Sequence, residues 1–137
     1  MRKRETGFTL VELITVIILV SIVSVTLFSR VGNIKSVNLQ ASRDDLIAAL
    51  FFAQQAAMAR SNIQVIVTNN SVSVTENGTP IIVHSKGYPL NFASGVTATP
   101  KTFIYDKLGR TTASTITLSS TGGISASVSV EASGYAH

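Results

Sequence analysis

Residues 8–28 limit the possible folds of this chain more than any other stretch, because they are apolar apart from a few hydroxyl side chains and one charge, Glu12. As a helix, these 21 residues would span about 31 Å, close to the roughly 30 Å hydrocarbon core of a bilayer. Arg2, Lys3 and Arg4 precede the stretch, and such basic residues keep an amino end cytoplasmic. We therefore expect a single membrane pass, with the bulk of the chain outside the cytoplasm.

Glu12 is the feature that a simple anchor does not explain. A carboxylate inside an apolar span costs roughly 2.5 to 3.5 kcal/mol on insertion scales and usually has a functional partner. A secretory signal is also a poor fit, because its apolar region is shorter and ends at a small-residue cleavage site. Cleavage between Gly7 and Phe8 would give Phe8 a charged α-amino group, and this cation could pair with Glu12 on the same or a neighbouring subunit.

The segment from Gly7 to Leu13, placed after a short basic leader and at the head of an apolar helix, closely resembles the type IV pilin superfamily. The resemblance implies that a prepilin peptidase cuts after Gly7 and methylates the amine of Phe8. It also implies that Glu12 pairs with the terminal amine of the adjacent subunit during assembly. The implied partners are other major and minor pilin subunits, the prepilin peptidase and an inner-membrane assembly platform.

The rest of the chain reads as one extracytoplasmic domain. After a polar stretch at 30–40, residues 41–60 predict an amphipathic helix, with Arg43, Asp44, Gln55 and Arg60 outward. Its apolar face is predicted to hold Leu46, Leu50, Ala53 and Ala57, widened by Ile47, Phe51 and Met58. Alternating apolar residues then predict strands around 63–67, 72–74, 81–83, 103–105, 116–118 and 128–130. Turns are expected at 69–70, 77–78, 86–87, 106–109 and 121–123, with Asn77-Gly78 the strongest hairpin signal.

These patterns predict an α+β, pilin-like fold: a long N-terminal helix, half membrane-spanning and half amphipathic, packed on a mainly antiparallel sheet. The expected parts are a leader (1–7), a transmembrane and assembly helix (8–29), a linker with an amphipathic helix (30–60) and a β-rich head (61–137). After cleavage the protein would sit in a bacterial inner membrane with a periplasmic head, and then in a pilus or pseudopilus.

Three alternatives remain within this resemblance. Residues 46–67 look like the minor pseudopilins of type II secretion and their fimbrial relatives. Residues 43–58 and the ending 134–137 are most similar to a minor pilin of the mannose-sensitive haemagglutinin pilus. The first reading implies protein export, and the second implies pilus assembly or initiation at a filament tip, with adhesion as an added role. A third option is a minor pilin that binds DNA during uptake.

Composition argues against the DNA-binding option and against catalysis. The net charge of +4 falls to +2 without residues 1–7, and the remaining cations are scattered rather than clustered. The chain has no cysteine and two histidines, His84 and His137, without ligand-like spacing. No nucleophile motif or phosphate-binding glycine loop occurs, and adjacent Asp44 and Asp45 fit a solvated helix face. We expect no enzyme activity, metal or cofactor.

Overall fold

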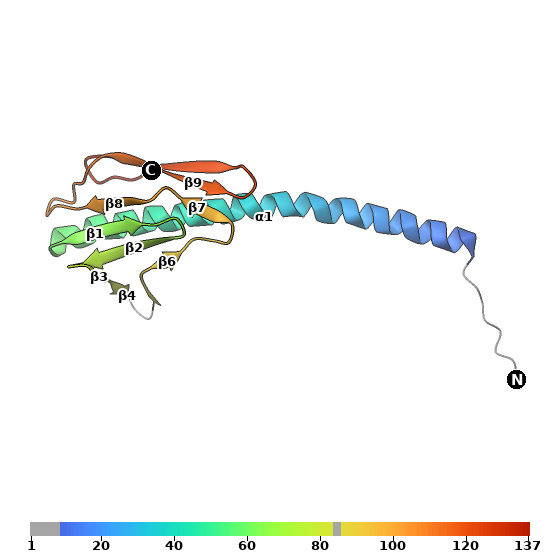
Figure 1. Cartoon of the computed structure of the whole chain (residues 1–137), viewed down its shortest axis with the longest axis horizontal. Helices are drawn as coiled ribbons and strands as arrows, with labels where there is room; N and C mark the ends of the chain where they lie inside the picture. The colour runs from blue at the N-terminus through green and yellow to red at the C-terminus, as the bar shows by residue number, and fades with distance from the viewer. Residues whose placement is uncertain (1–8, 84–85) are drawn as a thin grey trace, which may run out of the picture. The chain divides into compact units, whose positions relative to one another are not determined.

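The computed structural model describes residues 9–83 and 86–137, with the backbone alone for 26–33, 83 and 86. The predicted leader at 1–7, Phe8 and His84 lie outside the described residues. The chain divides into two compact units, Met1–Ile34 and Lys35–His137. One helix, α1 (Leu10–Ala59), contributes to both units, and all strands belong to the second. Figure 1 shows these strands gathered around the carboxyl-terminal part of α1.

α1 is continuous over 50 residues. The linker predicted after residue 30 is therefore wrong, because residues 30–40 are helical. Gly32 and Asn33 are weak helix formers, but a glycine costs only about 1 kcal/mol relative to alanine in a helix. No proline stands between residues 30 and 59, so nothing in this stretch blocks the helical hydrogen bonds.

Within Lys35–His137, α1 buries one face against the sheets. The predicted positions Leu46, Leu50, Ala53 and Ala57 are all buried, which confirms the core face of this helix. Phe51 and Met58 were expected to widen that face, but both side chains are 55% exposed. That prediction is wrong because 3.6 residues per turn place both residues on the opposite side of the helix from Leu46 and Ala53.

In the described residues, the strands form three antiparallel sheets. The largest has the order β3-β2-β1-β8, with β6 also paired to β2. Its strands are β1 (Ile63–Val67), β2 (Ser71–Glu76), β3 (Thr79–Pro80), β6 (Leu90–Asn91) and β8 (Lys101–Ile104). The second, ordered β10-β9-β7, contains β7 (Val96–Ala98), β9 (Ser114–Ser120) and β10 (Ser125–Val130). The third pairs β4 (Ile82–Val83) with β5 (Lys86–Gly87).

The strongest predicted turn is confirmed. Asn77 and Gly78 both have positive φ, 52° and 81°, and they join β2 to β3 with Glu76 opposite Thr79. The Asn62 side-chain amide donates to Asn77 Oδ1 at 2.7 Å, which ties this hairpin to the residues after α1. Lys86-Gly87 was also predicted as a turn but forms β5, so that prediction is wrong: Gly87 pairs with Ile82, and its missing side chain leaves room for Ile82.

The core is one cluster of side chains from α1 and both larger sheets. The period-two pattern of the sequence is confirmed in it, because alternate residues along the strands are buried. The buried strand residues at the predicted positions are Ile63, Val65, Val67, Val72, Val74, Phe103, Ile116, Leu118, Val128 and Val130. The fold is therefore the predicted α+β arrangement, a long helix packed on antiparallel sheet.

Candidate functional site

Of the three predicted site residues, the structure places Glu12 and leaves Gly7 and Phe8 outside the described residues. Glu12 lies in the first turn of α1. The exposed N–H groups of a first helical turn carry partial positive charge, so a carboxylate is favourable there. The pairing predicted for Glu12 thus involves a side chain at the amino end of the helix, four residues after the predicted new terminus at Phe8 in the sequence.

Thr9 is a part of this site that the sequence analysis did not single out. Its hydroxyl accepts a hydrogen bond from the Glu12 backbone N–H at 3.2 Å, and its carbonyl accepts one from the Leu13 N–H at 3.1 Å. Thr9 is therefore the N-cap of α1, with Glu12 at the third helical position. The spacing Thr-x-x-Glu is the signature of a capping box and could have identified Thr9 from the sequence.

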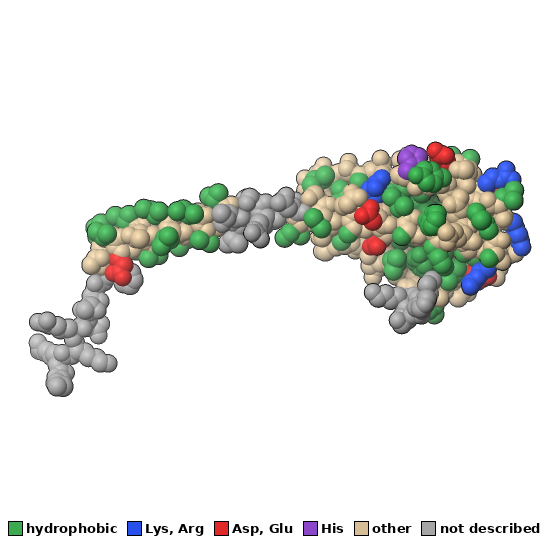
Figure 2. All heavy atoms as spheres, turned by 180° about the vertical axis from the view of Figure 1, so that it is seen from behind, with side chains coloured by type: hydrophobic (Ala, Val, Ile, Leu, Met, Phe, Trp, Pro, Cys, Tyr) green, Lys and Arg blue, Asp and Glu red, His purple; other side chains and the backbone are tan. Residues whose placement is uncertain are grey.

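The helix after this cap presents apolar side chains in every direction. Water-exposed helices normally keep a charged or polar side, but the large hydrophobic residues of 10–25 are exposed all round, Leu10 at 74%. Figure 2 shows hydrophobic side chains over most of the visible surface of this segment. The exposed residues are Leu10, Val11, Leu13, Ile14, Val16, Ile17, Ile18, Leu19, Val20, Ile22, Val23 and Val25. Such a surface is built to be covered by other apolar material.

The hydroxyl groups in this segment are satisfied within the helix itself. Thr15, Ser21 and Ser24 each donate to the carbonyl four residues earlier, all at 2.7 Å. Internal bonds of this kind remove the need for water at these positions, which suits a low-dielectric environment. Glu12 is the one ionisable side chain in residues 10–25. Among the helices in the described part of the chain, none combines the length and hydropathy needed to cross a membrane.

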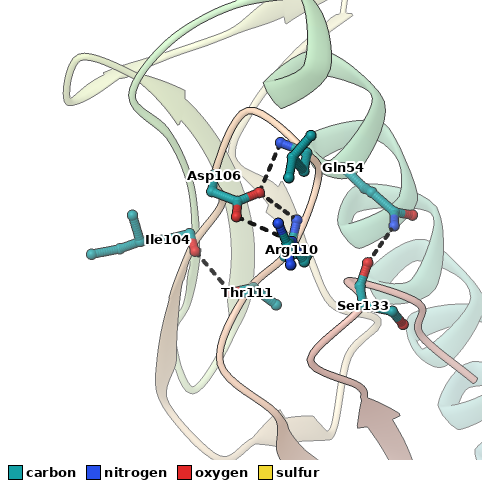
Figure 3. A network of polar contacts seen from close by, with 7 residues as sticks. Gln54, Ile104, Asp106, Arg110, Thr111 and Ser133 are labelled. Atoms are coloured by element: carbon teal, nitrogen blue, oxygen red, sulfur yellow. Dashed lines mark hydrogen bonds and ion pairs between the residues drawn. The ribbon is translucent and has the colours of Figure 1, made fainter.

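A second organised region lies beside the last turns of α1, in the turn at 106–110 and the loop at 131–135 (Figure 3). Asp106 Oδ1 accepts hydrogen bonds from the backbone N–H groups of Leu108 and Arg110, both at 2.8 Å. These contacts lower the pKa of Asp106, with the Arg110 backbone N–H as the largest cause, followed on the lowering side by the Leu108 N–H and the Arg110 charge. The turn is therefore held closed by a side chain that stays ionised.

The loop at 131–135 packs onto this turn through two glycines. A Cβ added to Gly134 would collide with the Gly109 carbonyl oxygen, and one added to Gly109 would lie 2.8 Å from Met58 Cε. The Gln54 side-chain amide donates to the Ser133 carbonyl at 3.0 Å. α1, the turn and the loop thus form one junction in which backbones touch.

Two other polar side chains of the described part of the head are a buried tyrosine and a histidine stacked on a tyrosine. Tyr105 is buried and its hydroxyl has no hydrogen-bond partner among the described residues. Burial raises its pKa to about 12, so it stays neutral at ordinary pH. His137 stacks on Tyr135 with ring centres 5.5 Å apart. In the described ranges, no group of three or more His, Cys, Asp or Glu side chains could hold a metal.

Comparisons with known proteins give a family match for the amino-terminal segment and a solved structure with a similar fold. Residues 2–28 match the family described as the prokaryotic N-terminal methylation motif, a range that contains Gly7, Phe8 and Glu12. The crystal structure of the type IV minor pilin FimU from Pseudomonas aeruginosa strain PAO1 has a similar fold. The TM-score is 0.54 over 72% of this chain and 90% of that chain, with 16% sequence identity. No curated protein matches the sequence.

Proposed function

We propose that this chain works as a processed assembly subunit of a type IV pilus. Its N-terminal methylation motif and its minor-pilin fold support membership of the type IV pilin superfamily. In this proposal residues 1–7 are a leader removed by the prepilin peptidase, and the amine of Phe8 is methylated. Residues 8–29 hold the subunit in the inner membrane, and the head faces the periplasm. The protein acts by assembly and not by catalysis.

One observation carries this proposal: in residues 10–25 of α1, a single carboxylate stands in the capped first turn, and the surface is otherwise apolar apart from three internally bonded hydroxyl groups. In a membrane, lipid covers the apolar side chains favourably. The carboxylate costs free energy there because it lacks a counter-charge. A neighbouring subunit with a free Phe8 amine offers that charge together with an equally apolar helix. Pairing of Glu12 with this amine would therefore favour transfer of the subunit from lipid into a filament.

Replacing Glu12 by alanine tests this step. Glu12→Ala removes the costly charge, so we expect normal insertion of the subunit in the membrane but a severalfold lower amount in sheared filaments. Thr15→Ala is the matched control, because it also removes a polar group from the same helix but leaves Glu12 and the cap in place. Immunoblots of sheared and membrane fractions give the readout. Equal incorporation of Glu12→Ala and the unaltered chain would rule out the pairing.

The finer resemblances support two types of filament. The likeness of residues 43–58 and 134–137 to the mannose-sensitive haemagglutinin group supports a minor pilin that acts in initiation at the filament tip, with adhesion as an added role. The likeness of residues 46–67 to secretion pseudopilins supports the competing role in protein export. The two differ in location: a pilus subunit is released by shearing intact cells, whereas a pseudopilin stays with the cell envelope.

A further inference from the structure

The turn at 106–110 holds an apolar side chain out in water between two cations. Leu108 is 64% exposed, with Lys107 before it and Arg110 two residues after it, both exposed. The turn cannot fold Leu108 inward, because Asp106 fixes the Leu108 and Arg110 N–H groups (Figure 3) and Gly109 packs on α1. Lys107 makes no ion pair with the described residues. Arg110 Nε lies 3.5 Å from Asp106 Oδ2, so this cation is already paired within the turn, although both side chains are exposed. The result is a rigid projection in which an exposed leucine stands between a lysine that is unpaired among the described residues and a paired arginine.

The complementary pattern occurs on α1, on the face that points away from the sheets. We call this the outer α1 face: residues 37, 41, 44, 45, 48 and 51, all exposed. Val37 and Phe51 are 63% and 55% exposed, and Ala41 and Ala48 between them leave space for close approach. The ionisable groups on this face are Asp44 and Asp45. Asp44 Oδ1 accepts a hydrogen bond from the Gln40 side-chain amide at 3.0 Å, and its ion pair with Arg43 is long, at 4.0 Å. The face is apolar with two carboxylates at its centre.

We propose that the 106–110 turn of one copy docks on the outer α1 face of a second copy, with Lys107 and Arg110 against Asp44 and Asp45 and with Leu108 on the small apolar residues. The occupant is a second copy because one chain carries both halves of the complementary pattern. Within one copy, the 106–110 turn and the carboxylates of the outer α1 face lie apart. The turn packs beside Gln54 at Gly109, and Gln54 is ten residues, or about 15 Å, along the helix from Asp44.

A contact between two different surfaces of identical copies leaves one surface open at each end, so further copies can add beyond a dimer, in a ring if the rotation closes and in an open filament if it does not. This contact deepens the assembly role proposed above and rests on it. It supplies a head-to-head interaction, separate from the pairing of Glu12 with an amine. Because its charges are exposed, it should weaken as the salt concentration rises.

Charge reversal in two differently tagged full-length copies, co-purified in detergent at low salt, tests the contact. Each single variant, Lys107→Glu or Asp45→Lys, should lower co-purification of two copies of that same variant roughly tenfold. Each substitution brings two charges of the same sign together across the contact. A mixture of the two variants should recover co-purification, because the altered turn of one variant then meets the altered face of the other with opposite charge. Recovery in the mixture cannot come from misfolding of either variant.

Lys101→Glu is the matched control, because Lys101 is an exposed lysine at the start of β8, away from the turn, and its reversal changes the net charge equally. It should leave co-purification unchanged. The proposal is overturned if the mixture stays as weak as the single variants, if Lys101→Glu acts like Lys107→Glu, or if unaltered copies do not associate. In each of those cases, Glu12-dependent incorporation into filaments would still stand by itself.

Discussion

Gly134 and Gly109 hold the junction at the end of α1 together by having no side chains. Gly134 has φ +86° and faces the Gly109 carbonyl oxygen, whereas Gly123, in the turn between β9 and β10, has φ +77° and open space around it. An alanine at either position meets the same left-handed backbone penalty, but only at Gly134 does it also meet an atom. The comparison of the two positions therefore separates backbone strain from packing.

We expect Gly123→Ala to lower the free energy of unfolding by about 1 kcal/mol, from the left-handed conformation alone. Gly134→Ala should cost at least about 1 kcal/mol more, because the added methyl group forces the loop and the turn apart. Chemical denaturation of the full-length chain in detergent, followed by circular dichroism, measures both. Equal losses for the two variants would contradict the close backbone contact at this junction.

Thr9 and Glu12 show what residue-level patterns can and cannot predict. The sequence predicted a role for Glu12 from the cost of its charge, and the place of Glu12 in the first turn suits that role. The Thr9 cap was missed, although the Thr-x-x-Glu spacing is its sequence signal. The junction of Gly109 with Gly134 could not be predicted, since it joins residues 25 positions apart in sequence that only the folded head brings together.

At the scale of elements, regular repeats made prediction possible, and short or interrupted elements defeated it. The alternations at 63–67, 72–74, 116–118 and 128–130 lie in β1, β2, β9 and β10, which have five to seven residues each. β6 and β7 were missed because strands of two or three residues are too short to show a period. On α1 the core positions were right, but two large residues, Phe51 and Met58, were placed in the core by hydrophobicity although helical geometry points them outward.

Adjacent residues of α1 test that geometry. Leu50 is fully buried and Phe51 is largely exposed. Leu50→Ala should lower the free energy of unfolding by about 2 to 5 kcal/mol, because it leaves a cavity in the core. Phe51→Ala should change it by no more than about 0.5 kcal/mol, although it removes the larger side chain. The midpoints of denaturant unfolding give the comparison, and a larger loss for Phe51→Ala would reverse the orientation of this helix.

For the whole molecule, the sequence predicted the fold class because two separate signals agreed, an apolar helix with one carboxylate and a run of alternating strands. The structure and the fold of FimU confirm that class. The membrane segment at 8–29, cleavage after Gly7 and the pairing of Glu12 remain predictions. They concern a processed chain in a membrane or a filament, and a folded single chain does not contain those partners.

The central claim is that the chain is cleaved after Gly7, methylated on Phe8 and built into a surface filament. Mass spectrometry of the amino-terminal peptide tests it most directly, in filaments sheared from intact cells and in the inner membrane of the same cells. We expect a peptide that begins with methylated Phe8 in the sheared filaments. The same peptide confined to the envelope would transfer the protein to a secretion pseudopilus, and an intact Met1 in both fractions would contradict the assembly function.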